Sequence, residues 1–157
     1  GREAFTNKNL VIVDLHQNQP EIIECTPSGQ VGVQPVWMSD ANTLLFCQGA
    51  ENNQFDYGGS GVMVPGQRIW QRTAGGEMTA ISSGATDSAD YTPTVSDDCR
   101  NLIYLHLNEE NKGSLYLRNL NDSNSGSAEC KIMDLSGGSI GFYGNYLPKW
   151  FSVYWSL

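Results

Sequence analysis

Positive charge and histidine are scarce in this chain. Its 157 residues include nine Lys and Arg against 17 Asp and Glu, which gives a net charge of −8. Such a charge repels phosphate backbones and anionic lipid headgroups, so nucleic acid is not expected as a partner. The two histidines, His16 and His106, are expected in a turn and in a strand, where solvated or core-rim roles are commoner than acid–base or metal-ligand roles.

Long apolar runs are also absent. No segment approaches the roughly 20 residues needed to cross a bilayer, and the start lacks the charged-then-apolar pattern of a signal sequence. The sequence therefore predicts no membrane insertion. The chain opens at Gly1 without an initiator methionine, as expected of a processed end or of a boundary within a longer protein. Processing would indicate export.

Cys-x-x-Cys pairs are missing, although the chain has four cysteines: Cys25, Cys47, Cys99 and Cys130. Their spacing argues against zinc, iron–sulfur and thioredoxin-like chemistry. The even number favours disulfides, with four buried free thiols as the alternative. Abundant Gly, Ser, Asn and Thr, and a glycosylation-type triplet that begins at Asn121, favour an extracytoplasmic location.

No apolar pattern at helical spacing is longer than about two turns, so the predicted fold class is all-β. Short β-rich runs flank turn-like segments in three places. These predicted hairpins pair residues 10–13 with 21–25, 68–72 with 77–81, and 114–118 with 129–133.

One phrase occurs three times, beginning at Pro35, Pro93 and Pro148, which are 58 and 55 residues apart. The first two copies are followed by apolar runs at 44–47 and 102–105, as a turn is followed by a buried strand. The proline fixes φ at a strand entry, and a Ser-Asp pair accepts backbone hydrogen bonds that close a turn.

This repeat predicts structural roles for its aspartates and tryptophans. Asx-type turns explain Asp40, Asp97 and Asp98 better than catalysis does. An aromatic side chain two residues after the proline is expected to pack between neighbouring sheets. Core positions are therefore predicted for the tryptophans at repeat positions, which are Trp37, Trp70 and Trp150.

Residues 69–105 contain a Trp strand, Gly75-Gly76-Glu77, Tyr91-Thr92-Pro93 and the Ser96-Asp97-Asp98 turn. This segment resembles the propeller repeat of TolB and of the non-catalytic domains of prolyl-oligopeptidase-like peptidases. The resemblance extends over roughly residues 9–152. It implies four-stranded blades and mostly binding roles.

The expected architecture is a single domain, residues 1–157, with repeat units at about 9–50, 68–110 and 114–157 and a loop insertion at 51–67. About three propeller-like four-stranded antiparallel units are too few to close a ring, so we expect an incomplete propeller or a sandwich-like stack. Unpaired strand edges attract partners. The predicted assembly residues lie in apolar terminal strands: Leu10, Val11, Ile12, Val13, Val153, Tyr154 and Leu157. Pairing of the two terminal strands within one molecule is the alternative.

Residues 137–141 match the Gly-x-Ser-x-Gly pattern of serine hydrolases. The match fails in context, because residues 142–148 make a poor helix and no histidine follows Ser139. We therefore predict that the chain is not an enzyme.

The predicted binding residues are aromatic and acidic side chains in loops and near the C-terminal end: Phe55, Asp56, Tyr57, Tyr143, Tyr146 and Trp155. Insertions such as 51–61 often carry recognition. Calcium is a conceivable cofactor through Glu51 and Asp56 or through Asp87 and Asp90. Tyr57, Tyr143, Tyr146, Tyr154 and Trp155 are also candidate stacking faces for sugars.

The functional hypothesis is a non-enzymatic extracytoplasmic structural or protein-binding module that associates with copies of itself in a multimer or fibre. Two alternatives remain open. One is a secreted glycan-binding domain, and the other is an accessory propeller segment of a larger hydrolase.

Overall fold

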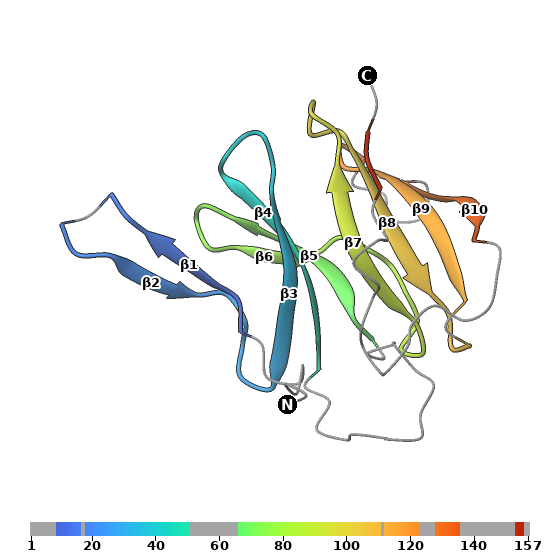
Figure 1. Cartoon of the computed structure of the whole chain (residues 1–157), viewed down its shortest axis with the longest axis horizontal. Coiled ribbons are helices and arrows are strands. Elements are labelled where there is room, and N and C mark those ends of the chain that lie inside the picture. Colours follow the sequence, from blue (N-terminus) through green and yellow to red (C-terminus); the bar gives the residue numbers. More distant parts are fainter. Residues whose placement is uncertain are drawn as a thin grey trace.

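The computed structural model describes residues 9–16, 18–50, 66–110, 112–122, 128–135 and 153–155. Within these ranges ten strands form three antiparallel sheets of two, four and four strands, and none of the sheets closes into a barrel (Figure 1). This confirms the predicted all-β class. The described ranges contain no apolar helix of membrane-spanning length.

Each sheet is built from strands that follow one another along the chain, and Figure 1 shows the three sheets side by side in sequence order. The two-stranded sheet is a hairpin of β1 (Val11–Asp14) and β2 (Glu21–Glu24). The first four-stranded sheet contains, in spatial order, β3 (Gln30–Trp37), β4 (Thr43–Ala50), β5 (Arg68–Thr73) and β6 (Met78–Ala80). The second contains β7 (Ala89–Val95), β8 (Asn101–Leu107), β9 (Gly113–Asn119) and β10 (Glu129–Asp134).

The three predicted hairpins are present, as β1–β2, β5–β6 and β9–β10. Their grouping into sheets differs from the predicted units. The sequence placed β5 and β6 at the start of the second unit, but they complete the sheet that begins with β3 and β4. Each of the first two Pro phrases therefore opens a sheet, and the hairpin that follows closes the same sheet. The third phrase lies outside the described residues.

The first two copies of the phrase adopt the same backbone. Gln34 and Thr92, each directly before the proline, have positive φ angles of 54° and 50°. A register shift in the strand pairing follows in both copies, between Val33 and Val36 and between Tyr91 and Thr94. The extra residues bend both strands at the place where a proline cannot donate to the ladder.

The turns after the phrases also match, with Ala41 and Cys99 at φ angles of 55° and 58°. Asp40 Oδ1 accepts from the Asn42 and Thr43 amides, at 2.9 and 3.0 Å. Asp98 Oδ1 accepts from the Arg100 amide at 3.0 Å. Asp40 and Asp98 therefore close turns, as predicted.

The main core lies between the two four-stranded sheets. Leu45, Cys47 and Ile69 from the first sheet pack against Leu102 and Tyr104 of the second, and all five side chains are fully buried. A separate cluster on the second sheet combines Ala89, Tyr91, Leu105 and Leu107.

Polar contacts also join these two sheets. The Gln34 carboxamide oxygen accepts from the Thr92 amide at 2.9 Å and from the Cys47 thiol at 3.3 Å. Ser39 Oγ donates to the Asp97 carbonyl at 2.6 Å. The two Pro phrases thus contact one another across the seam.

The predicted disulfides are not present, because Cys25, Cys47, Cys99 and Cys130 are all free. They lie in different parts of the fold. Cys25 follows β2, Cys47 is in β4, Cys99 is in the turn between β7 and β8, and Cys130 is on β10. Burial raises the pKa of the Cys25 and Cys47 thiols.

The predicted C-terminal strand is not seen in residues 153–155, which have no strand conformation. This segment contacts β7 instead. Thr94 Oγ1 donates to the Val153 carbonyl at 3.3 Å, and Trp155 Nε1 donates to the Thr94 carbonyl at 3.2 Å. Among the described residues β1 pairs with β2 and not with the C-terminal segment.

Candidate functional site

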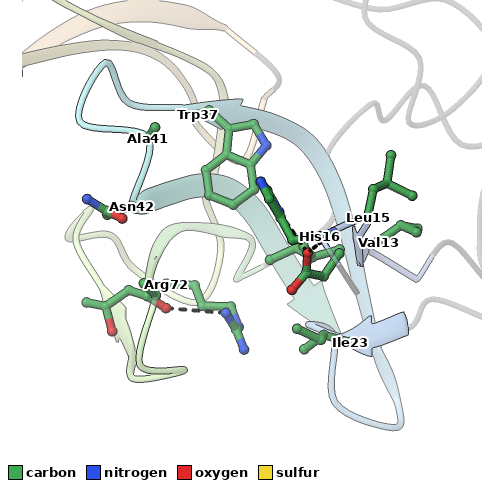
Figure 2. A pocket seen from close by; sticks show the side chains of 12 residues that line it. Val13, Leu15, His16, Ile23, Trp37, Ala41, Asn42 and Arg72 are labelled. Atoms are coloured by element: carbon green, nitrogen blue, oxygen red, sulfur yellow. Dashed lines mark hydrogen bonds and ion pairs between the residues drawn. The ribbon is translucent and has the colours of Figure 1, made fainter. Parts of the chain in front are cut away.

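A groove of about 410 Å³ lies between the β1–β2 hairpin and the first four-stranded sheet. Figure 2 shows Trp37 and Arg72 on the sheet side, facing side chains from the hairpin. The hairpin side is lined by Ile12, Val13, Asp14, Leu15, His16 and Ile23. The sheet side is lined by Trp37, Ala41, Asn42, Arg72, Thr73 and Ala74.

Trp37 is 52% exposed, so its predicted core position is wrong. The internal repeat gives the reason. Val95 occupies the equivalent place in the second sheet, beside Leu102, and it packs against the main core because the first sheet covers it. Trp37 lies beside Leu44 on the face that, among the described elements, the two-stranded hairpin alone covers.

The groove also exposes one edge of β1. The lining includes every residue from Ile12 to His16. Successive side chains of a strand point to opposite faces, so an unbroken run of lining residues means that the strand turns its edge to the groove. Within the described residues β1 pairs with β2 alone.

Hydrogen-bond alternation identifies the open backbone groups of β1. The Cys25 amide donates to the Leu10 carbonyl at 2.9 Å. In an antiparallel ladder every second pair is hydrogen-bonded, so Ile12 and Asp14 bond to β2, opposite Ile23 and Glu21. The amides and carbonyls of Val11 and Val13 therefore point away from β2, to the open edge.

Arg72 places a positive charge in this groove. Its Nη1 donates to the Thr73 carbonyl at 3.3 Å, and among the described residues no carboxylate lies within ion-pair distance of its guanidinium. The neighbouring Asp14 carboxylate is occupied by His16, whose amide and Nδ1 lie 2.8 and 3.0 Å away. Hydrogen bonding from the His16 amide is the main reason why the pKa of Asp14 lies below its usual value.

A second polar cluster is buried between the sheets. The fully buried Asp90 accepts from Ser82 Oγ at 2.6 Å and lies 2.8 Å from His106 Nδ1. Arg68 Nη1 is 3.9 Å from the same carboxylate. These are the residue types of a hydrolase triad, but the carboxylate lies between the serine and the histidine, so this contact gives the hydroxyl no imidazole base.

Several predicted site residues lie outside the described ranges: Glu51, Phe55, Asp56, Tyr57, Ser139, Tyr143, Tyr146, Trp150 and Leu157. Of the others, Tyr154 is 83% exposed, Trp155 is half-buried against Thr94, and Asn121 is exposed in the turn after β9.

The predicted calcium ligands Asp87 and Asp90 do not share a site, because Asp87 is exposed while Asp90 is buried with its own partners. In the part of the chain that the structure describes, no group of three His, Cys, Asp or Glu side chains is arranged to hold a metal ion.

Comparison with known proteins gives a structural likeness but no match to a family model or a curated protein. The structure is similar to that of a protein described as a dipeptidyl aminopeptidase IV from Bacteroides ovatus, with 15% sequence identity and a TM-score of 0.46. The likeness covers 69% of this chain and 20% of that protein, so the chain spans about one fifth of that protein's length.

Proposed function

We propose that this chain is a non-enzymatic protein-binding module that associates with copies of itself through the outer face of the β1–β2 hairpin. The supporting observation is the exposure of that face: Val11 is 44%, Val13 49% and Ile22 68% exposed. Val13 is opposite Ile22 in the strand pairing, so these side chains lie on one face. A two-stranded hairpin with an apolar face is marginally stable until another surface covers it.

The remainder of the fold supports this role. The facing sides of the two four-stranded sheets are buried against one another, whereas the outer face of the hairpin has no described element against it. A second copy supplies the same patch across a two-fold axis. Because the patch has only three side chains, the contact buries much less than the ~1,200 Å² of a stable interface, and we expect weak, concentration-dependent association.

Light scattering during size-exclusion chromatography tests the proposal. We expect the average mass to rise with concentration for the wild type. Ile22→Lys should keep the chain monomeric, because it places a charge in the patch. The matched control is Ile132→Lys on β10, where the isoleucine is also exposed, at 48%, but lies outside the hairpin. A monomer at all concentrations, or equal loss of association in both variants, would refute the proposal.

A second candidate is an accessory unit of a larger propeller. The observation in its favour is the succession of two stacked four-stranded meander sheets after a hairpin of half their width. A chain that is insoluble alone but folds when expressed with preceding sequence would favour this candidate. The extracytoplasmic location and the glycosylation of Asn121 stay predictions.

A further inference from the structure

The hairpin covers only part of the sheet face beside it. In the second sheet one row consists of Val95, Leu102 and Arg118, and its first two side chains pack in the core that this sheet shares with the first sheet. The equivalent row in the first sheet is Trp37, Leu44 and Arg72, and the two-stranded hairpin covers it. The groove therefore lies where a wider sheet would continue.

The two arginines of these rows differ in their partners. Arg118 is buried and pairs with Glu129, at 3.5 Å between Nη1 and Oε2. Arg72 sits at the corresponding position with no carboxylate in ion-pair distance among the described residues. The repeat thus shows that a carboxylate can accompany this arginine position, whereas the carboxylate in the groove lining, Asp14, is held by His16.

The open edge of β1 supplies the remaining recognition elements. The free amides and carbonyls of Val11 and Val13 are able to continue a β-ladder. Alternate side chains of an added strand would point to the sheet face, where the groove lining includes the apolar side chains of Trp37 and Ile23 together with Arg72. Branched aliphatic walls favour aliphatic peptide side chains over the hydroxyls of a sugar.

We infer that this groove binds an extended segment of a different polypeptide, which adds as a strand to β1 and places an acidic side chain on Arg72. This inference rests on the proposed protein-binding role and names its partner's chemistry. A second copy of the chain does not fit as the occupant. Each described strand of a copy is held in its own sheet, so it could enter the groove only together with that sheet and not as a single extended segment.

Fluorescence anisotropy with a labelled probe tests the inference. The probe is a blocked peptide of about eight residues, a usual strand length, with alternating Val and Thr and one central Glu. The comparison peptide has Gln in place of Glu. We expect the Glu peptide to bind about fivefold to tenfold more tightly, as for a partly desolvated charged hydrogen bond, and Arg72→Gln to remove that preference. Arg100→Gln is the matched control, since Arg100 is exposed in the β7–β8 turn.

Val13→Pro separates strand addition from simple adhesion to the groove. It removes an amide that points to the open edge and not to β2, so the hairpin should remain folded. We expect it to abolish binding of both peptides, while Val13→Thr retains binding. Binding that survives Val13→Pro, or an equal affinity of wild type for the two peptides, would overturn the inference.

The measurement is made at concentrations where light scattering shows single protomers. Self-association without peptide binding would overturn the inference and leave the proposed function standing. Peptide binding by a chain that stays monomeric at every concentration would support the inference and overturn the proposed self-association. Displacement of the probe by excess unlabelled chain would overturn the assignment to a different polypeptide.

Discussion

Asp90 shows how single residues hold the two sheets together. Its buried carboxylate accepts from Ser82 and contacts His106, and Arg68 lies nearby. Asp90→Ala would leave a buried hydroxyl and a guanidinium with a side-chain exposure of only 12% without this carboxylate. We expect a loss of about 3–5 kcal/mol in the free energy of unfolding, measured by urea denaturation. Asp87→Ala is the control, because Asp87 is exposed three residues before Asp90, and it should change stability little.

The turn aspartates give a pH-dependent prediction. Hydrogen bonds from Asn42 to Asp40 and from Ser96 to Asp98 are the main reasons why both carboxyl pKa values lie below the usual 3.8. A lowered folded pKa stabilises the fold above the unfolded pKa, and this contribution is lost as the pH falls through the folded value. Asp40→Ala and Asp98→Ala should therefore lower the melting temperature near neutral pH. The difference from wild type should vanish below the usual carboxyl range in a thermal melt followed by circular dichroism.

The structural role of a residue could be predicted from the sequence where that role depends only on the neighbouring backbone. The Ser-Asp turns needed only the chemistry of adjacent amides, and Asp40 and Asp98 confirm them. Trp37 was mispredicted because its exposure depends on how many strands cover its face, which no local pattern encodes. The available signal was its place in the first copy of the repeat, which follows a single predicted hairpin at residues 10–25.

At the scale of elements, the two four-stranded sheets are joined at the bulges beside Pro35 and Pro93. Gln34 and Thr92 occupy equivalent positions, but only Gln34 sends its side chain across the seam. Thr92 Oγ1 is buried without a hydrogen-bond partner among the described residues, and its φ is strained for a β-branched side chain.

These two positions should respond differently to alanine. Gln34→Ala removes the acceptor of the Thr92 amide, and we expect a loss of about 1–3 kcal/mol. Thr92→Ala removes an unpaired hydroxyl, so we expect stability to be unchanged or raised by up to about 1 kcal/mol. Chemical denaturation of both variants measures this, and an equal loss in the two would contradict the assigned role of Gln34.

The strands themselves were largely predictable, because apolar runs and turn residues mark them locally. The borders between sheets were not. The sequence of a hairpin such as β5–β6 has the same pattern whether the hairpin opens one sheet or closes another. Only the pairing of β5 with β4 shows that it closes the first four-stranded sheet. The sequence did not predict the groove for the same reason. Its lining combines Ile23 from the two-stranded sheet with Arg72 from the first four-stranded sheet, and the sequence did not show where one sheet ends and the next begins.

For the whole molecule, the free thiols are the most direct check on the arrangement of sheets. Cys47 is fully buried in the seam, and Cys130 is exposed on β10. We expect a thiol reagent to label Cys130 rapidly in the native protein and Cys47 only after denaturant is added, as followed by intact mass. A mass that shows no reactive thiol even in denaturant would indicate that the predicted disulfides form.

The seam between the Pro phrases has a kinetic consequence. Its polar contacts join residues 58 positions apart, as between Gln34 and Thr92 and between Ser39 and Asp97. A long chain segment must be ordered before such contacts form, so the docking of the sheets comes late and the refolding time should lie in the range of milliseconds to seconds that is typical of nonlocal β topologies. During that interval each meander sheet presents an uncovered apolar face, and the yield of refolded protein should fall as its concentration rises.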